Sequence, residues 1–437
     1  MTSNPSLTDP ESFFSTEPWT LGVIGLGYVG LPLAVTAVQR GLGAVGFDVS
    51  EERVSGLLDG HSPVDDVSDE VLQKALADGL VITTDADRLR EADAIMICVP
   101  SPLGRNRQPD LSFIQSAADT IRRVVRPGQL IALESTTYPG TTEDFIVPAI
   151  ADAGLQLDRD VWVAFSPERV SPGDPMKTGD IPKIVGGVTP MSTLVATAAY
   201  RRVVPSVHPV SSSRAAEMAK LLENTYRAVN IALVNEMAQL AAALDIDIWE
   251  VIEAAATKPF GFEPFWPGPG VGGHCIPLDP QYLAWRAREA KFATRFIDLA
   301  EQVNTQMPAY NTSRIAELLN DRGLPVFGIE ILAIGISYKA NVGDDRESAS
   351  IEVIEGLAKR GANISVMDPL IGDDRIREGG WDPVGPDDDL SRFAIALILT
   401  DHDAVDYARI ASEVPIVYDA RGAYRRRGLS YDNVVVL

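Results

Sequence analysis

A cysteine in the middle of a glycine- and proline-rich loop is the first candidate for chemistry. The segment 260–280, FGFEPFWPGPGVGGHCIPLDP, holds five glycines and five prolines around Cys275, with Asp279 four residues further on. Glycine lets a backbone approach a ligand closely and proline fixes what lies between, so we predict a stiff, shaped loop. A thiolate is the most ready protein nucleophile near neutral pH, which points to covalent chemistry. The other interpretation of a lone cysteine is a small buried apolar side chain.

A second pattern, LGVIGLGYVG, begins at Leu21 and places Gly25, Gly27 and Gly30 after an apolar run. A helical segment and another apolar run follow, and that run ends at Asp48. Strand, G-x-G-x-x-G, helix and strand ending in an acid is the pattern of dinucleotide binding. An acid at this place accepts hydrogen bonds from the adenosine ribose and repels a 2′-phosphate, so we predict NAD rather than NADP. The alternative is a tight turn that binds no ligand.

Apolar runs alternate with helical segments through the first half of the chain. Runs at 80–84, 94–100, 129–136 and 161–169 predict a parallel sheet with helices on both faces. Ligands gather at the carboxyl ends of such strands. Cys98 lies inside one apolar run and is expected in the core. The predicted strand ends carry Val99, Pro100, Ser135, Thr136 and Glu168.

A long amphipathic helix is expected over residues 211–244, which contain no proline. Lys220 and Asn224 stand four residues apart in it, hence on one face, although Lys220 could also be an ordinary exposed lysine. The helix is apolar on more than one face, which favours a dimer interface along it. Residues 283–321 predict a further helix, broken near Pro308.

The last part of the chain predicts a second doubly wound half. An apolar run leads to Gly335, and helix and strand patterns follow, but the dinucleotide glycines are absent. Lys339, Arg346 and Arg421 suit a ligand that bears phosphate, although each would be unremarkable as a surface charge. A β-α-β unit of this kind suggests a different nucleotide, such as one that carries a substrate.

The composition narrows the class of protein. Among 437 residues, 46 % are hydrophobic and 23 % charged, as in soluble globular proteins of about three domains. The net charge of −23 argues against nucleic acid or an anionic membrane as partner. Two cysteines provide neither a disulfide framework nor zinc spacing, so no metal is expected. Residues 1–18 lack signal-peptide features and no apolar run reaches a membrane-spanning length, so we expect a disordered tail and a cytoplasmic protein.

Taken together, these motifs resemble the UDP-glucose/GDP-mannose dehydrogenase family from about Leu21 to the C-terminus. The matching stretches, in the family's order, are GLGYVGLPLA, ESTTYPGTTE, SPERV, AEMAKLLENTYRAVNIALVNE, PGPGVGGHCIPLDP and GISYKANVGDDRES. The resemblance implies an α/β protein with two doubly wound Rossmann-like domains joined by a long central helix and a helical dimerisation region. The expected parts are a tail at 1–18, an NAD-binding domain at 19–205, a central domain with the cysteine loop at 206–320, and a nucleotide-sugar-binding domain at 321–437.

The resemblance also implies a reaction. The family oxidises the C6 hydroxyl of a nucleoside-diphosphate hexose to a carboxylate, with four electrons leaving in two hydride transfers to NAD. Cys275 matches the nucleophile that traps the aldehyde as a thiohemiacetal, which becomes a thioester that water releases. Asp279 matches an acid that acts as a base with an ordered water. Lys220 matches a lysine that stabilises the developing oxyanion, and Asn224 helps to hold that oxygen. Two further positions match residues for water placement and proton handling, Thr136 and Glu168.

Two binding sites follow from the same resemblance. The NAD site comprises Gly25, Gly27, Tyr28, Val29, Gly30, Asp48, Arg53, Val99, Pro100, Ser135, Thr136 and Arg346. The nucleotide-sugar site comprises Glu168, Arg169, Val170, Lys220, Asn224, Lys258, Phe265, Gly270, Gly272, Gly273, Tyr338, Lys339 and Arg421. Lys258 lies where relatives present a basic residue, often across a dimer interface. A homodimer or an oligomer built from dimers is therefore expected.

Several alternatives remain at the level of the sequence. The SPERVSPGD segment with its Arg169, together with ESTTYPGTTE and KPFGF, resembles the branch that oxidises UDP-N-acetylhexosamines. UDP-glucose and TDP-glucose are the alternative substrates. A two-electron dehydrogenase would not need the thiol, and a catalytically silent nucleotide sensor would have no reason to keep Cys275, Lys220, Asn224 and Asp279 together.

Overall fold

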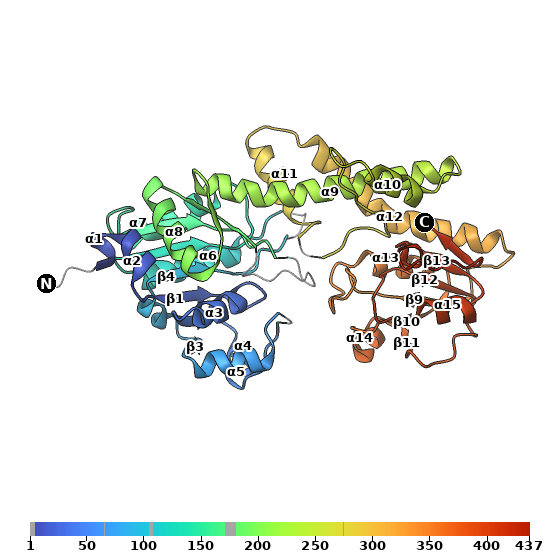
Figure 1. The fold of residues 1–437 in the computed structure, drawn as a ribbon, viewed down its shortest axis with the longest axis horizontal. Helices are drawn as coiled ribbons and strands as arrows, with labels where there is room; N and C mark the ends of the chain where they lie inside the picture. The colour runs from blue at the N-terminus through green and yellow to red at the C-terminus, as the bar shows by residue number, and fades with distance from the viewer. Residues whose placement is uncertain (1–4, 65, 105–107, 171–180, 274) are drawn as a thin grey trace. The chain divides into compact units, whose positions relative to one another are not determined.

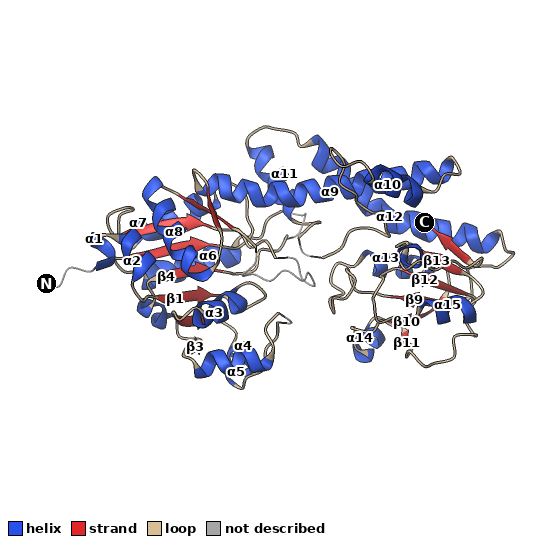
Figure 2. Ribbon diagram, in the orientation of Figure 1, coloured by secondary structure: helices blue, strands red, loops and turns tan. Residues whose placement is uncertain are grey.

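The computed structural model describes residues 5–64, 66–104, 108–170, 181–273 and 275–437. The chain forms two compact units, each with its own β-sheet (Figure 1, Figure 2). The first unit comprises Met1–Glu223 with Gln281–Lys291, and the second comprises Asn224–Pro280 with Phe292–Leu437. Within the described ranges, no helix combines the length and the apolar character needed to cross a bilayer.

The sheet of the first unit has eight strands among the described residues, in the order β3-β2-β1-β4-β5-β6-β7-β8. Neighbouring strands are parallel except β6 and β7, which are antiparallel. The strands are β1 (Thr20–Ile24), β2 (Gly43–Phe47), β3 (Leu80–Thr83), β4 (Ala94–Ile97), β5 (Gln129–Leu133), β6 (Val161–Phe165), β7 (Lys183–Gly187) and β8 (Val207–Pro209).

Both faces of this sheet are buried because its central strands are apolar at nearly every position. Leu130 and Ala132 of β5 pack in one apolar cluster, and Ile131 and Leu133 pack in another, as the alternation of side chains along a strand requires. Helices complete each cluster, as expected for a parallel sheet. One face is covered by α3 (Gly30–Gln39), α4 (Glu51–Leu58), α5 (Asp69–Ala77) and α8 (Pro190–Val203), and the other by α6 (Ser112–Val124), α7 (Val147–Asp152) and a 3₁₀ helix (Ala86–Glu91).

The N-terminal segment contains helices where a disordered tail was expected. Residues Pro5–Thr8 form α1 and Pro10–Thr16 form α2, while residues 1–4 lie outside the described part. Phe14 is fully buried and packs edge-on against Trp19, with ring centroids 5.5 Å apart. Arg202 of α8 donates hydrogen bonds to carbonyl groups of the segment. The expectation was based on the mostly polar composition of these residues. It overlooked the aromatic side chains, whose apolar area is large enough to dock the segment.

The long helix α9 (Ser213–Ala243) confirms the predicted central helix. The prediction of a break near Pro308 is wrong: α12 (Arg295–Asn320) passes through the proline, and the interruption lies earlier, after α11 (Asp279–Glu289). A proline inside a helix removes one main-chain hydrogen bond, and burial of the Pro308 ring offsets this loss. A Cβ atom on Gly270 would lie 3.3 Å from the Cδ atom of Pro308. The cysteine loop therefore packs directly on the proline ring. A shorter helix, α10 (Ile248–Ala256), lies between α9 and this loop in the sequence.

The sheet of the second unit has six parallel strands among the described residues, in the order β11-β10-β9-β12-β13-β14. This order repeats that of the first six strands of the other sheet, so both are doubly wound with a switch point beside the first strand. The fold-class prediction is confirmed. The strands are β9 (Glu330–Ile334), β10 (Asn363–Met367), β11 (Asp382–Pro383), β12 (Ile395–Ile398), β13 (Val417–Asp419) and β14 (Val434–Val436), with helices α13 (Ala349–Ala358), α14 (Asp373–Glu378), α15 (Tyr407–Glu413) and α16 (Ala423–Arg426).

The docking of α2 makes a testable prediction about stability. Phe14→Ala removes a fully buried ring, so we expect the free energy of unfolding to fall by about 3 kcal/mol. If only the segment detaches, limited proteolysis will cut before Trp19 while the rest of the unit stays intact. The exposed Glu11→Gln variant is the control and should change stability by less than about 0.5 kcal/mol. Wild-type stability and an unchanged digestion pattern for Phe14→Ala would contradict the docking.

Candidate active site

The loop between β1 and α3 carries the three glycines of the dinucleotide pattern. Gly25 has a φ of 93°, and a Cβ atom there would lie 2.6 Å from the Cys98 carbonyl oxygen. A Cβ atom on Gly30 would lie 1.9 Å from the Gly25 carbonyl oxygen, so α3 can begin against the strand only with glycine here. Gly27 faces open space, where the nearest atom to its would-be Cβ is Arg53 Nη1 at 3.9 Å. The loop thus has the turn, the packing and the room that a pyrophosphate needs at a helix N-terminus.

Asp48 lies just after β2 and is buried. Its Oδ2 atom accepts a hydrogen bond from Leu26 N at 2.9 Å, and its Oδ1 atom accepts one from Ser50 N at 3.0 Å. Arg53 Nη1 lies 3.5 Å from Oδ2, and Tyr28 is exposed on the glycine loop. A carboxylate has about four acceptor sites, so capacity remains for ribose hydroxyls. These residues fit NAD, with the glycine loop against the pyrophosphate and Asp48 against the ribose. Val29 immediately precedes α3.

The carboxyl ends of β4, β5 and β6 bring further predicted residues to the same edge of the sheet. The Ser135 hydroxyl donates a hydrogen bond to the Val99 carbonyl oxygen at 2.8 Å, which joins the ends of β4 and β5. Pro100 and the half-buried Thr136 follow directly in the sequence, and Glu168 follows β6. Parallel strands end at the same edge of a sheet. The prediction that these residues lie at the carboxyl ends of the strands is therefore confirmed. Cys98 is buried, as predicted.

A buried lysine beneath Glu168 was missed by sequence reasoning. Lys183 Nζ lies 2.6 Å from Glu134 Oε2 and 2.9 Å from Glu168 Oε2. Burial raises the pKa of Glu134, whose Oε1 atom accepts a hydrogen bond from the Tyr200 hydroxyl at 2.6 Å. Burial also acts to raise the pKa of Glu168, but the Lys183 charge and hydrogen bonds outweigh it, so this pKa is lowered. The signal was a lysine inside the apolar run IPKIVGG.

The main chain after Glu168 completes its surroundings. The N–H groups of Arg169 and Val170 donate hydrogen bonds to Glu168 Oε1 at 2.7 and 2.8 Å. The Arg169 guanidinium forms an ion pair with Glu223 at 2.7 Å. Residues 171–174 of the SPERVSPGD segment lie outside the described residues.

The first turns of α9 tie the ESTTYPGTTE loop to the helix. The buried Glu217 carboxylate accepts hydrogen bonds from Gly140 N at 2.6 Å, from Thr142 N at 2.9 Å and from the Thr142 hydroxyl at 2.7 Å. Burial raises the pKa of Glu217. Lys220, three residues further along α9, is 8 % exposed, which does not agree with an ordinary surface lysine. The helix therefore holds the loop that contains Thr136 and presents Lys220 from a fixed backbone.

In the second unit, the structure brings three predicted catalytic residues together. The Cys275 carbonyl oxygen accepts hydrogen bonds from Leu278 N at 3.3 Å and Asp279 N at 2.9 Å, and this turn leads into α11. Cys275 is exposed, whereas Asp279 is buried. The Asn224 side-chain amide donates a hydrogen bond to Asp279 Oδ2. The turn thus places an exposed cysteine four residues before a buried aspartate, whose carboxylate is held from α9.

The glycines before Cys275 let the loop lie against the segment that follows β9. A Cβ atom on Gly272 would lie 2.6 Å from the Glu347 carbonyl oxygen, and one on Gly273 would lie 2.8 Å from Tyr338 Cε2. The structure accounts for these glycines by close packing within the chain. Burial, Asp344 and then the nearby Cys275 raise the pKa of Tyr338 to about 12. Tyr338 is therefore a neutral hydrogen-bond donor beside the cysteine loop.

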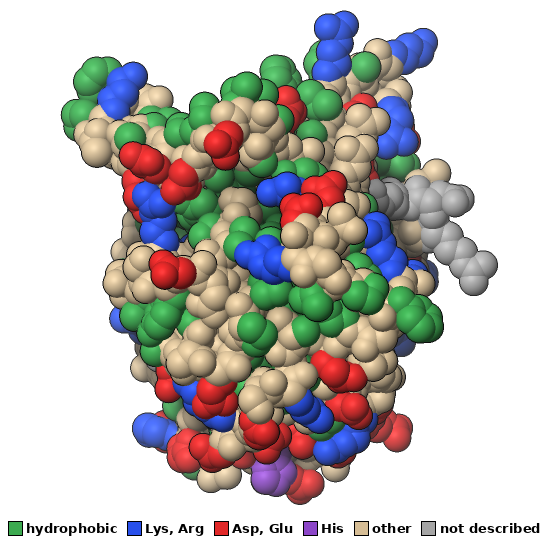
Figure 3. Space-filling model, turned by 90° about the vertical axis from the view of Figure 1, so that its right-hand side faces the viewer, with side chains coloured by type: hydrophobic (Ala, Val, Ile, Leu, Met, Phe, Trp, Pro, Cys, Tyr) green, Lys and Arg blue, Asp and Glu red, His purple; other side chains and the backbone are tan. Residues whose placement is uncertain are grey.

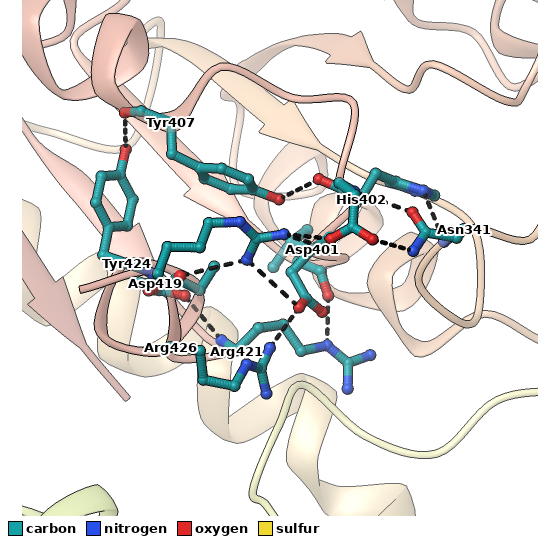
Figure 4. Close-up of polar contacts among 12 residues, drawn as sticks. Asn341, Asp401, His402, Tyr407, Asp419, Arg421, Tyr424 and Arg426 are labelled. Carbon is teal, nitrogen blue, oxygen red and sulfur yellow. Dashed lines mark hydrogen bonds and ion pairs between the residues drawn. The ribbon is translucent and has the colours of Figure 1, made fainter. Parts of the chain in front are cut away.

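Arg421 comes to the same loop from the end of β13 (Figure 4). Its Nε atom donates a hydrogen bond to the Leu399 carbonyl oxygen at 2.8 Å, and its main-chain N–H donates one to Asp419 at 3.0 Å. A Cβ atom on Gly268 would lie 2.9 Å from Arg421 Nη1. Burial lowers the pKa of Arg421. The structure thus joins a basic residue predicted for the substrate site to the cysteine loop.

The loop after β9 is clamped by the segment after β12 (Figure 4). His402 Nδ1 accepts a hydrogen bond from Asn341 N at 3.1 Å, and Asn341 has a left-handed backbone with φ of 61°. Arg426 pairs with Asp401 in the same cluster. The loop contains the half-buried Lys339. Its backbone is therefore fixed by contacts that the sequence pattern did not reveal.

Asp368 is the counterpart of Asp48 in the second sheet, but its surroundings differ. Its carboxylate accepts hydrogen bonds from Ile336 N at 2.8 Å and from the N–H and hydroxyl of Ser337 at 3.1 and 3.0 Å. His402 Nε2 lies 3.3 Å away. Burial acts to raise the pKa of Asp368, but the neighbouring His402 and hydrogen bonds from the backbone lower it to about 2. Protein donors occupy this carboxylate, so the second sheet does not reproduce the NAD site.

The remaining predicted residues lie on the second unit. Lys258 Nζ lies 5.0 Å from the ring centroid of Phe260, and the Phe265 ring packs edge-on on Tyr226 at 5.8 Å. The guanidinium of Arg346, a residue predicted for the cofactor site, donates two hydrogen bonds to the Asp344 carboxylate. On the face that Figure 3 shows, Lys and Arg side chains are interspersed with Asp and Glu and form no continuous basic surface. The part of the chain that the structure describes contains no cluster of three or more metal-ligating side chains.

The two acids allow a matched test of the cofactor site. Asp48→Asn keeps a hydrogen-bonding side chain but removes the charge, so we expect the dissociation constant for NADH to rise about 10- to 100-fold in a fluorescence titration. Asp368→Asn is the control, because its carboxylate serves the protein, and NADH affinity should stay within about twofold. An NADH affinity in Asp48→Asn equal to that of the wild type would remove Asp48 from the site.

The same control variant tests the pH dependence of stability. Because the pKa of Asp368 is lowered from 3.8 to about 2, its ionised form stabilises the fold above pH 4, and this contribution is lost as the pH falls towards 2. Asp368→Asn should lower the free energy of unfolding at pH 7 by about 2 kcal/mol and flatten its pH dependence in that window. An unchanged slope below pH 4 would contradict the assignment.

Comparison with known proteins adds to this geometry. The chain matches the UDP-glucose/GDP-mannose dehydrogenase family in its NAD binding domain over residues 19–204, its central domain over 214–306 and its UDP binding domain over 332–426. It is 35 % identical to UDP-N-acetyl-D-glucosamine 6-dehydrogenase of Pseudomonas aeruginosa, over 84 % of this chain and 86 % of that protein. It is 36 % identical to UDP-N-acetyl-D-mannosamine dehydrogenase of Methanococcus maripaludis strain C7, over 87 % and 86 % of the two chains. The structure of UDP-D-ManNAc dehydrogenase from Pyrococcus horikoshii superposes with a TM-score of 0.84 at 31 % identity, covering 95 % of this chain and 98 % of that one.

Proposed function

Because the chain belongs to the UDP-glucose/GDP-mannose dehydrogenase family, we propose that it oxidises the C6 hydroxyl of a UDP-N-acetylhexosamine to the carboxylate. It is an NAD-dependent oxidoreductase of nucleotide sugars. The observation that carries the proposed mechanism is the turn that presents Cys275 next to Asp279, whose carboxylate accepts a hydrogen bond from Asn224. Bound NAD, held by the glycine loop and Asp48, accepts one hydride in each oxidation.

The need for a thiol follows from the chemistry of the intermediate. An alcohol loses a hydride and a proton to become an aldehyde, but an aldehyde cannot donate a hydride until a nucleophile adds to its carbonyl carbon. Addition of the Cys275 sulfur forms a C–S bond and a thiohemiacetal, which can lose the second hydride to become a thioester. One water molecule then breaks the C–S bond and releases the uronate and the thiol.

The other residues that match the family's catalytic positions would divide the remaining work. Asp279 would accept the proton that each oxidation releases, and Asn224 would orient this carboxylate. Lys220 would stabilise the negative charge that develops on the sugar oxygen. Glu168 and Thr136 would place the water. Tyr338 and Arg421 would bind the nucleotide part of the substrate, since both lie against the loop that carries Cys275.

The choice of sugar rests on the relatives and on one segment of the chain. Two of the relatives compared above act, by name, on UDP-N-acetylglucosamine and UDP-N-acetylmannosamine. The Arg169 side chain is held by Glu223 next to Glu168, where a change of a few residues would alter the pocket around the sugar. UDP-glucose and TDP-glucose are the alternatives that the following experiment decides.

The stoichiometry of the reaction tests the mechanism and the substrate together. With limiting UDP-N-acetylglucosamine, UDP-N-acetylmannosamine, UDP-glucose and TDP-glucose in parallel, we expect two NADH per molecule of one N-acetylated sugar. Cys275→Ser should reduce uronate formation by a factor on the order of 10³ or more while substrate binding persists. Cys98→Ala removes the other cysteine and should keep the stoichiometry of two. One NADH per sugar in the wild type would demote Cys275 to a bystander, and full uronate production by Cys275→Ser would overturn the mechanism.

We further propose that the protein forms a homodimer along α9. Exposed apolar side chains recur along one stripe of this helix at Tyr226, Leu233 and Leu240, each about half exposed. Their two spacings of seven residues place them on one face of the helix. An apolar stripe of this length is typical of a helix that packs on a partner.

A single charge in the stripe tests the dimer. Leu233→Glu should convert a dimer into a monomer at micromolar concentration in sedimentation velocity, because it buries a carboxylate in an apolar interface. Leu58→Glu, which also replaces an exposed leucine but lies on α4, is the matched control and should leave the dimer intact. A wild-type monomer at this concentration would contradict the proposal.

A further inference from the structure

The cluster beneath Glu168 holds a charge that the proposed mechanism does not use. Lys183 opens β7, and its side chain is 3 % exposed. Its ammonium lies 2.6 Å from Glu134 Oε2 and 2.9 Å from Glu168 Oε2. The Glu134 side chain is fully buried, whereas that of Glu168 is 16 % exposed. Lys183 therefore cannot reach a substrate, but it contacts a residue that can.

Among the described residues, the Glu168 carboxylate takes part in hydrogen bonds only as an acceptor. Its Oε1 atom accepts hydrogen bonds from the N–H groups of Arg169 and Val170, and its Oε2 atom accepts one from the Lys183 ammonium. A protonated carboxyl group would lose one of these interactions and would place a proton against a donor. The site thus favours the carboxylate and fixes the plane of the group.

The second carboxylate explains the orientation of the lysine. Glu134 accepts hydrogen bonds from Lys183 through Oε2 and from the Tyr200 hydroxyl through Oε1. These contacts hold the ammonium between Glu134 Oε2 and Glu168 Oε2. A buried cation between two carboxylates is compensated, whereas the carboxylates without the cation would be an uncompensated buried charge.

We propose that Lys183 is a positioning residue, which keeps Glu168 ionised and in one orientation so that it accepts a proton or a hydrogen bond from the water that the reaction consumes. This inference rests on the proposed function and deepens it, because it makes Glu168 an acceptor in the hydrolytic step and excludes it as a proton donor. Water placed by a fixed carboxylate attacks faster than water that must first be oriented.

The proposal predicts that two variants shift the pH profile differently. Lys183→Met removes the cation, so Glu168 should ionise only at higher pH and the acidic limb of the kcat–pH profile should move up by one pH unit or more. Glu134→Gln removes a neighbouring negative charge, so the limb should stay or move down. At pH 7 we expect Lys183→Met to lower kcat about 10- to 100-fold with KM for both substrates within about twofold. The thioester on Cys275 should accumulate, as intact-protein mass spectrometry would detect.

Conservative and distant substitutions provide the controls. Lys183→Arg retains the charge and should return the acidic limb towards its wild-type position, which a purely structural role would not require. Lys359→Met removes an exposed lysine that pairs with Glu355 at 3.5 Å and should shift nothing. Lys183→Met leaves two buried carboxylates without a cation, so the double variant Lys183→Met/Glu134→Met offers a second test in which Glu168 alone is charged. Its acidic limb should also lie above that of the wild type.

The outcomes separate this inference from the proposed function. If the wild type releases two NADH per sugar but the acidic limb of the Lys183→Met kcat–pH profile does not move, only the role of Lys183 is overturned. That role is also overturned if Lys183→Met lowers kcat equally at every pH and Lys183→Arg does not restore it. A wild type that produces no uronate from any sugar of the panel would overturn the proposed function, and the inference with it.

Discussion

The hydrogen bond from the Asn224 side chain to the Asp279 carboxylate is the contact on which the cysteine loop depends. Asp279 begins α11, and its N–H is bound by the Cys275 carbonyl group, so an anchor on Asp279 also fixes the backbone of the cysteine. On its other side the loop lies directly on Tyr338 and Pro308, at distances that only glycine permits. A loop restrained in this way holds a nucleophile in one geometry without the entropy cost of ordering it at each turnover.

The two sheets show how one topology supports different binding sites. Both have the same strand order around their first strand, and both place an acid after the second strand. Asp48 binds two main-chain N–H groups and retains acceptor capacity. Asp368 is surrounded by donors of its own unit, including the fully buried His402. The difference lies in the donors that tertiary packing brings to each carboxylate, not in the acids themselves.

The strongly acidic composition gives special weight to cations that are buried or half-buried. With a net charge of −23, the protein can hold anionic groups only where basic residues, hydrogen-bond donors or a helix N-terminus are placed locally. Lys183 serves internal carboxylates, whereas Arg421 lies at the carboxyl ends of the second sheet against the cysteine loop. Burial makes each of these charges more effective than a surface charge, because solvent screens it less.

Features that depend on local sterics and periodicity could be predicted from the amino-acid sequence alone. The glycine pattern predicted the loop before α3, alternating apolar runs predicted two doubly wound sheets, and an uninterrupted amphipathic stretch predicted α9. Local rules failed where burial outweighed them, at the docked Phe14 and at Pro308 inside α12. The contacts between polar side chains could not be predicted in this way, because Lys183 and Glu134 are 49 positions apart in the sequence, and Asn224 and Asp279 are 55 positions apart. Such pairs depend on which strand and helix ends come to the same edge, and long-range packing, which no local pattern encodes, sets that arrangement.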